Sequence, residues 1–291
     1  MPLRLFALAF QFCLSFLGAM APALFAANAV AAPQRIISTH LCTDEYVFRL
    51  VPRNRIEALS YLAGDTHPVV STIADKVNGI RLIRPSAEEV LTLAPDLVVL
   101  YEGTNPRLKT QLAEMRIPFI EIPWADSLAQ IREVTTRLGK EFGEPERAKA
   151  MLSEMDKQLS LARSTALGLL VPTLIYEPSG YATAGGVTDE ILSAAGLSNA
   201  AASMGTTRSG TIPIETVVAA APQLLILNGG ARHAMSQADF VLQHPALRLL
   251  DAKTLTLSAT LTPLLCPGPW SASVAPALAE MGARVRHRQG L

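Results

Sequence analysis

The sequence predicts an α/β protein of two similar lobes, each with a parallel central sheet, joined by one long helix and separated by a ligand cleft. Three observations predict this fold. Short apolar segments alternate with helical segments in both halves of the chain, one segment of the first half recurs in the second, and a long uninterrupted helical segment lies between them. Apolar strands that alternate with helices are typical of a parallel sheet covered on both faces. The 291 residues are enough for two modest domains.

Residues 1–31 are expected to be a secretory signal peptide. Arg4 precedes a long apolar run, and the segment ends in small residues around Ala29 and Ala31, which form an A-x-A-like cleavage pattern. A retained membrane anchor is the alternative, but the polar Gln11 and the clean cleavage pattern favour removal. We therefore expect an exported, soluble and monomeric protein after cleavage.

The composition and the motifs exclude two function classes. The formal net charge is zero, so the chain lacks the basic excess typical of nucleic-acid binding. Ser38, His40 and Asp44 are nearly contiguous, whereas a catalytic triad is assembled from separated segments. The nucleophile-elbow, phosphate-loop and dinucleotide fingerprints are also missing from the sequence. We expect a binding protein, not an enzyme, with no cofactor of its own.

The first lobe is expected to span residues 33–143. Thr43, Ser86 and Ser127 are suited to cap helices, and Pro95 ends the second of them. The predicted strands are 35–38, 55–60, 97–100 and 119–122, and the predicted helices are 43–50, 88–94, 107–115 and 127–138.

Residues 144–167 are predicted to form the linking helix. Pro145 suits the first turn, and the flanking Glu144 and Glu146 complement the positive helix start. Apolar residues recur at three- and four-residue steps, at positions 152, 155, 159 and 162, so they share one face. A helix of about 24 residues is on the order of 36 Å long, enough to span the side of a two-lobed protein.

The second lobe, residues 168–291, repeats the pattern of the first. The segment 215–227 matches 88–100: in both, Glu precedes Val by two residues and Pro by seven, and an apolar strand follows. The remaining predictions are a strand at 172–176, a helix that opens at 188 and a final helix at 273–286. Two matched segments in the same order favour two similar lobes.

The cleft should be lined by the loops that follow the strands, because ligands of α/β sheets bind beyond the carboxyl ends of strands. In the first lobe these loops are 39–42, 61–67, 101–103 and 123–124, and in the second they are 177–181, 185–186, 208–210, 228–230 and 265–270. They are rich in Tyr, Trp, Gly and single charges, which suits a sizeable, partly apolar ligand. The candidate ligand-binding residues are Trp124, Tyr181, Arg208 and Trp270, followed by Tyr61, His40 and Tyr101.

Cys42 and Cys266 are the two cysteines left once Cys13 leaves with the signal peptide. An even pair in an exported protein is a disulfide candidate, although the sequence does not show that the two are close. Two buried thiols and thiolate ligation of a metal are the alternatives. Because one cysteine lies in each lobe, a bond between them would restrict opening.

At this point a family resemblance becomes specific. The chain resembles the periplasmic substrate-binding proteins of ferric-siderophore, haem and cobalamin ABC importers. Four segments together carry this resemblance: residues 36–44, the 88–100 segment, the long helix and the 215–227 segment. The resemblance implies two Rossmann-like lobes joined by one helix, a ligand between them, a periplasmic location, and an ABC permease with its ATPase as partners. It also implies that one exposed glutamate on each lobe docks onto arginines of the permease. Glu88 and Glu215 stand at those positions.

The resemblance leaves the ligand open between a ferric siderophore and a corrinoid, either of which would bring its own iron or cobalt. Haem is an alternative, with His40 or His67 as the axial ligand. A bare Zn or Mn ion is another, since possible metal ligands gather in neighbouring loops of the first lobe. These residues are His40, Cys42, Asp44 and His67. His233 and His244 of the second lobe fall outside the expected cleft loops.

Overall fold

The computed structural model describes residues 31–229, 237–250 and 254–290. The predicted signal peptide therefore lies outside the described residues, apart from Ala31. Residues 32–291 form one compact unit, and the description that follows is of that unit. Within the described ranges, no helix combines the length and the apolar character that crossing a membrane would require.

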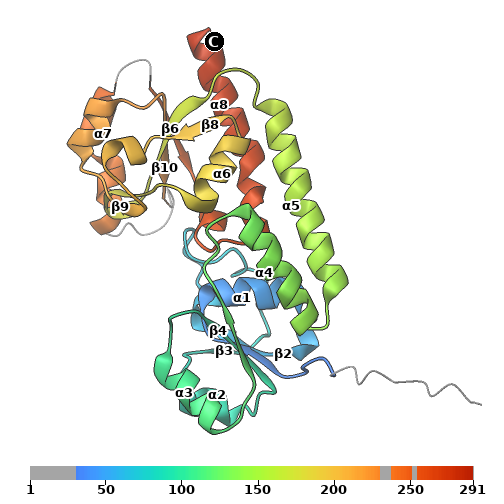
Figure 1. Ribbon diagram of the computed structural model, residues 1–291. Helices are drawn as coiled ribbons and strands as arrows, with labels where there is room; N and C mark the ends of the chain where they lie inside the picture. The colour runs from blue at the N-terminus through green and yellow to red at the C-terminus, as the bar shows by residue number, and fades with distance from the viewer. Residues whose placement is uncertain (1–30, 230–236, 251–253, 291) are drawn as a thin grey trace, which may run out of the picture. The chain divides into compact units, whose positions relative to one another are not determined.

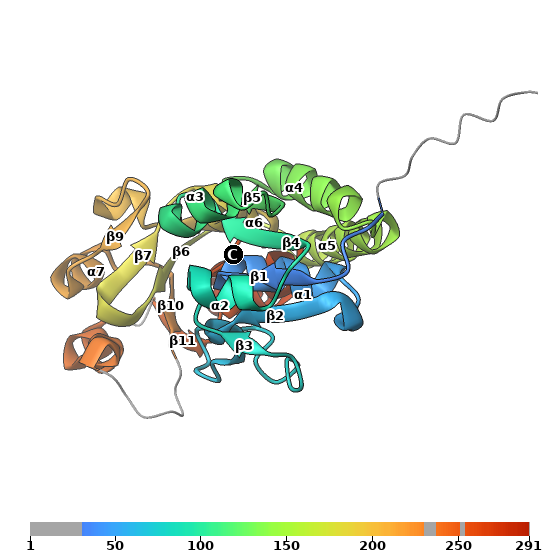
Figure 2. The same ribbon diagram turned by 90° about the horizontal axis from the view of Figure 1, so that it is seen from below.

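The first lobe is built on a five-stranded sheet in the order β3-β2-β1-β4-β5, in which all neighbouring strands are parallel. Figure 2 shows these strands side by side. Their bounds are β1 Ile36–Ser38, β2 Ile56–Ser60, β3 Leu82–Ile83, β4 Leu97–Tyr101 and β5 Phe119–Ile122. Side chains of α1 (Leu41–Leu50) and α4 (Leu128–Glu141) share an apolar core with one face of the sheet. Those of α2 (Ala87–Thr92) and α3 (Pro106–Glu114) share a second core with the other face, as expected for a covered parallel sheet.

The long helix α5 (Pro145–Thr165) begins with Pro145 in its first turn, as predicted. Its buried side chains Met155, Leu159 and Ala162 join the core of the second lobe, while Ala148 near its start joins the core of the first. In Figure 1, α5 runs along one side of the two lobes. The helix therefore contributes to both cores.

The second lobe has a four-stranded parallel sheet in the order β11-β10-β6-β8. Its strands are β6 Val171–Tyr176, β8 Leu197–Asn199, β10 Leu224–Asn228 and β11 Leu255–Ala259, and its helices are α6 Gly186–Ala194, α7 Ile214–Ala220 and α8 Ala275–Gln289. The recurrence found in the sequence corresponds to α2–β4 in the first lobe and α7–β10 in the second. The sequence did not predict the additional antiparallel pair of β7 (Tyr181–Thr183) and β9 (Ser209–Thr211). The fold is the predicted α/β class with parallel central sheets in two lobes.

The start of α1 differs from the prediction, which placed Thr43 at the cap. The N-cap is His40, whose Nδ1 accepts the Cys42 N–H at 3.2 Å. Thr43 is the third helical residue, and its hydroxyl accepts the His40 N–H at 3.1 Å. The two side chains form a reciprocal capping box, so the N-cap lies three residues earlier than expected.

Asp44, on the same helix, is fully buried. Its carboxylate accepts hydrogen bonds from the Ser60 N–H at 3.0 Å and the Ser60 hydroxyl at 2.5 Å. Burial nevertheless dominates and raises the pKa of Asp44 to about 7. Asp44 therefore has a structural role that links α1 to β2.

Asp44→Asn is expected to stabilise the protein more at pH 8 than at pH 5. Because the folded-state pKa lies above the unfolded value of 3.8, the native state binds more protons between about pH 4 and pH 7, and the free energy of unfolding falls as the pH rises through that range. Asparagine is neutral; its Oδ1 can still accept the Ser60 N–H, and its Nδ2 can donate to the Ser60 hydroxyl oxygen. The advantage of the variant should grow by about 2–3 kcal/mol from pH 5 to pH 8.

Urea unfolding of wild type and variant at the two pH values measures this difference. The exposed Asp75→Asn is the matched control, because it removes a carboxylate that is not buried. A difference between Asp44→Asn and wild type that does not change with pH would contradict the assignment.

Candidate functional site

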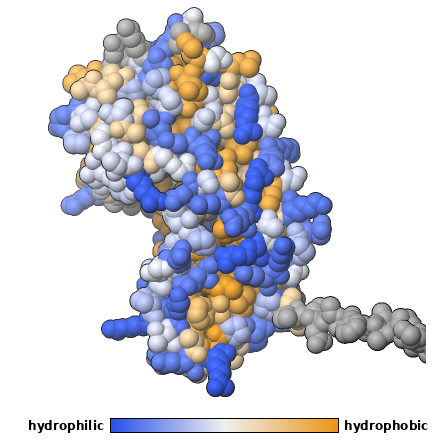
Figure 3. Space-filling view, in the orientation of Figure 1, coloured by the Kyte–Doolittle hydropathy of each residue, from blue (hydrophilic) through white to orange (hydrophobic). Residues whose placement is uncertain are grey.

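A cavity of about 870 Å³ lies between the two lobes, where the loops after several strands converge. Figure 3 shows the surface hollowed between the lobes. The first-lobe lining includes residues 40–42, Leu62, Tyr101 and 124–126, and the second-lobe lining includes Glu177, Tyr181, 183–188, Arg208 and 264–267. Most of the loops predicted to line the cleft contribute to this lining, but Asn228 and Gly229 at the end of β10 do not. A cavity of this size fits an organic ligand better than a bare ion.

Aromatic rings form much of the first-lobe wall. The rings of His40 and Tyr101 are stacked, with centroids 4.6 Å apart and planes 10° apart. Trp124, after β5, meets Tyr101 edge-on with centroids 6.4 Å apart. Trp124 is 47% exposed, and Tyr181 on the second lobe is 40% exposed. Two large rings, one from each lobe, are therefore open to a ligand.

His40 and Tyr101 are held in neutral forms. Partial burial lowers the pKa of His40, and its Nδ1 is occupied by the Cys42 N–H, so the imidazole carries its proton on Nε2. Burial also raises the pKa of Tyr101, whose hydroxyl has no hydrogen-bond partner among the described residues. A protonated Nε2 and a neutral phenol are both poor metal ligands.

The charged side chains that line the cavity do not give it a net positive charge. The Arg208 Nη2 atom lies 2.6 and 2.5 Å from the two carboxylate oxygens of Asp126. Arg208 is the only Lys or Arg among the described residues that line the cavity. Burial raises the pKa of Glu177, which accepts a hydrogen bond from the Asn228 amide at 2.7 Å. The cavity is neutral to slightly negative.

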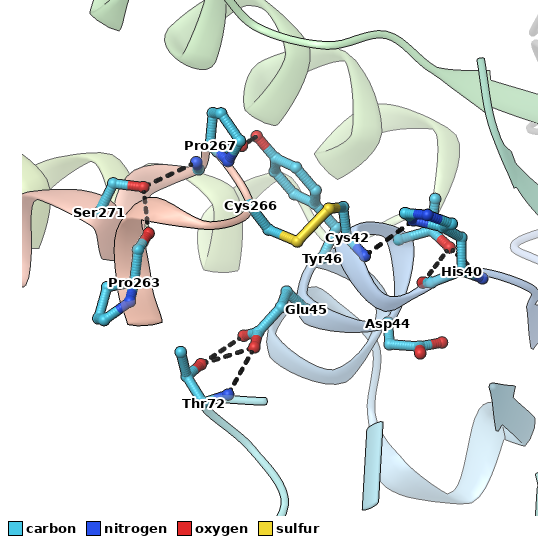
Figure 4. Close-up of a disulfide and its surroundings, with 12 residues drawn as sticks. His40, Cys42, Asp44, Glu45, Tyr46, Thr72, Pro263, Cys266, Pro267 and Ser271 are labelled. Carbon is cyan, nitrogen blue, oxygen red and sulfur yellow. Dashed lines mark hydrogen bonds between the residues drawn. A yellow bond between two sulfur atoms is a disulfide. The ribbon is translucent and has the colours of Figure 1, made fainter. Parts of the chain in front are cut away.

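Cys42 and Cys266 are joined by a disulfide, and both sulfur-bearing residues line the cavity. The bond ties the first turn of α1 to the segment 262–270, which follows β11 of the second lobe (Figure 4). The Tyr46 hydroxyl donates to the Pro267 carbonyl at 3.5 Å beside it. The predicted partners are therefore brought together in the wall of the cavity.

Trp270 does not line the cavity, contrary to expectation. Its ring packs edge-on against Tyr46 at 4.7 Å, lies under the Arg49 guanidinium at 5.1 Å, and is 91% buried in the first-lobe core (9% exposed). Its indole N–H donates to the Cys266 carbonyl at 2.9 Å. The segment 262–270 turns back onto α1, so this ring serves as an anchor between the lobes.

Tyr61 is also outside the cavity lining. It opens a short 3-10 turn, Tyr61–Gly64, that directs Leu62 into the lining. The Tyr61 ring is 43% exposed and lies under the Arg84 guanidinium at 4.2 Å. Conversely, Asp126 lines the cavity but was not predicted, although it is only two residues beyond Trp124 in the same loop. The position of that loop at the end of a strand was the signal that could have identified it.

The first-lobe residues considered as metal ligands do not form a site. Cys42 is in the disulfide, and the Asp44 carboxylate is bound to Ser60. No group of three or more His, Cys, Asp or Glu side chains suited to a metal ion occurs within the described ranges. His244 accepts the Ala246 N–H at 3.2 Å in its own turn, and His233 lies outside the described residues.

Glu88 and Glu215 occupy equivalent places on the two lobes. Glu88 is in the first turn of α2 and Glu215 in the first turn of α7, and both are exposed. Neither forms an ion pair with another residue in the described part of the chain. Both carboxylates are therefore available to a partner.

The sequence of this chain is similar to those of known binding proteins. A family model described as "Periplasmic binding protein" matches residues 69–253. The vitamin B12-binding protein of Photorhabdus laumondii is 27% identical over 242 residues, which cover 80% of this chain and 82% of that protein.

Solved structures share the fold. The periplasmic haem-binding protein RhuT from Roseiflexus sp. RS-1 aligns with a TM-score of 0.70 at 20% identity, covering 87% of this chain and 98% of that one. The periplasmic vitamin B12-binding protein BtuF of Vibrio cholerae aligns with a TM-score of 0.64 at 17% identity, covering 89% and 99% of the two chains.

Proposed function

This chain belongs to the periplasmic binding protein family, and on that premise we propose that it is the periplasmic receptor of an ABC importer whose ligand is a corrinoid of the cobalamin type. The role is binding and delivery without chemical change of the ligand. A permease with its ATPase at the inner membrane is the proposed partner.

The observation that carries the ligand proposal is the composition of the cavity wall. It combines about 870 Å³ of space with exposed aromatic rings from both lobes, Trp124 and Tyr181. Arg208, the one cationic side chain among the described residues of the lining, is already paired with Asp126. Corrinoids carry neutral amide side chains around a broad ring, whereas haem carries two carboxylates and many ferric siderophores are anionic. The likeness to a vitamin B12-binding protein supports the same choice.

Haem is the second candidate, because solved haem-binding proteins share this fold. Two observations weigh against it. The first is that His40, the histidine of the lining, uses Nδ1 as a helix cap and keeps Nε2 protonated. The second is that the Tyr101 hydroxyl oxygen is buried, so it is not open to an iron atom in the cavity. An anionic ferric siderophore would favour a positive lining, which the Arg208–Asp126 pair does not provide.

Tryptophan fluorescence tests the ligand proposal. Cobalamin and cobinamide are expected to quench emission saturably, and Trp124→Phe should lose most of the quenching while Trp270→Phe retains it, because only Trp124 lines the cavity. Isothermal calorimetry on the same variants gives the affinity independently of either tryptophan. Saturation by haemin or a ferric siderophore but by neither corrinoid would reject the corrinoid proposal and retain the receptor role. Saturation by Zn or Mn salts alone would reject the large-ligand cavity.

We also propose that Glu88 and Glu215 dock onto the permease. Their exposure and their equivalent positions on the two lobes support this role. Two carboxylates on separate lobes provide a two-point contact for basic residues of a partner.

A further inference from the structure

We infer that Asp126 sets the charge selectivity of the cavity: by neutralising Arg208 it disfavours ligands with peripheral carboxylates relative to neutral ligands of the same shape. This inference rests on the proposed function of the cavity as the site of a large chelate.

The geometry places the pair at the rim, with one partner on each lobe. Asp126 follows β5 of the first lobe, and Arg208 directly precedes β9 of the second. Both line the cavity, yet their side chains are 47% and 72% exposed, respectively. A ligand that fills the cavity would therefore meet the pair at its edge.

Stability does not account for this pair. An ion pair between exposed side chains contributes little to stability, because solvent screens the attraction and ordering two side chains costs entropy. The consequence for a ligand is larger. A guanidinium facing a cavity is well suited to bind a carboxylate in bidentate fashion, and such a charge-assisted bond is stronger once the ligand has displaced water from the cavity.

Asp126 removes this source of affinity in two ways. It occupies the Nη2 atom of Arg208 with both oxygens, so an anionic ligand would have to displace the Asp126 carboxylate or bind beside it to a guanidinium whose charge is already neutralised. It also places a negative charge where such a ligand would approach, and the partly buried Glu177 lies in the same lining. A neutral amide group experiences neither effect. The pair therefore favours neutral ligands over anionic ligands of the same shape.

The test compares two corrinoids that share one ring. Dicyanocobinamide carries neutral amides, and dicyanocobyrinic acid carries carboxylates at corresponding positions. Wild type is expected to favour the amide form. Asp126→Asn, which keeps the size of the side chain, should shift the ratio of the two Kd values toward the acid by about tenfold or more. Calorimetry at low salt measures both constants.

Two further variants make the result specific. The double variant Asp126→Asn with Arg208→Gln should lose the gain in relative affinity for the acid. The freed Arg208 guanidinium is the source of that gain, and the second substitution removes it. Glu102→Gln, which removes an exposed first-lobe carboxylate outside the lining, should leave the ratio at the wild-type value. The inference is overturned if Asp126→Asn and Glu102→Gln shift the ratio equally, or if the double variant keeps the gain.

Failure of the corrinoid proposal is distinguishable from failure of this inference. If wild type binds haemin and neither corrinoid, the same variants are titrated with haemin and with its dimethyl ester, which lacks the two carboxylates. In Asp126→Asn, a shift of at least about tenfold in the ratio of the two Kd values toward the acid would then support the proposed charge selectivity for a different ring. An unchanged ratio would reject it.

Discussion

Removal of the disulfide between Cys42 and Cys266 is expected to lower the free energy of unfolding by about 5 kcal/mol. The bond joins residues 224 positions apart, and the chain-entropy model gives a contribution of about this size for so long a loop. Both cysteines are buried, so Cys42→Ala with Cys266→Ala avoids placing unpaired hydroxyls in the core. For a chain of this length the loss corresponds to a fall of about 10 °C in Tm.

Thermal and urea unfolding, each with and without dithiothreitol, measure this effect. Reduced wild type should resemble the double variant, and the double variant itself should not respond to the reductant. Counting thiols in the oxidised mature protein provides an independent check. Two free thiols, or a stability that is the same in all four conditions, would contradict a stabilising bond.

Ligand affinity should fall less than stability. The segment 262–270 is also held to the first lobe by the buried Trp270 and by the Tyr46–Pro267 hydrogen bond. These contacts remain when the sulfur atoms are separated, so both walls of the cavity stay close to their positions. A loss of affinity as large as the loss of stability would instead indicate that the covalent bond alone keeps the lobes together.

Elements whose pattern is local were predictable from the sequence. The apolar runs at β4 and β10 identified central strands because a strand buried on both faces needs an almost continuous apolar sequence. Helix α5 was predicted to within two residues at each end, because Pro145 and the spacing of its apolar face are encoded within the helix itself.

The direction in which a side chain points was less predictable. Trp270 and Tyr61 lie in loops that the sequence correctly placed near the cavity, but one ring enters the first-lobe core and the other faces Arg84. Each choice depends on partners distant in the chain, which no local pattern reveals. The same reason explains the absence of Asp126 from the prediction: its partner Arg208 is 82 residues away.

Reversal of both exposed glutamates, Glu88→Lys with Glu215→Lys, is expected to reduce uptake by at least about a hundredfold. Each carboxylate is proposed to pair with an arginine that the docked permease covers, and loss of one partner of a buried, hydrogen-bonded charge pair typically costs about 2–5 kcal/mol at an interface. Reversal adds repulsion to that loss. Each single variant should be intermediate, because the carboxylates lie on separate lobes and act at separate points.

The measurement pairs transport with binding. Uptake of labelled cobalamin reports docking, and calorimetry on the purified variant reports ligand affinity, which should be unchanged because neither residue lines the cavity. Glu146→Lys with Glu154→Lys is the matched control, since it makes the same change in net charge at exposed positions of α5. Uptake that survives the reversal of Glu88 and Glu215 would show that docking uses another surface. An equal fall of uptake in the control would show that docking depends on general surface charge. Loss of uptake in the 88/215 variant alone, with affinity retained, would locate the transport defect after ligand capture, at the step where the receptor meets the permease.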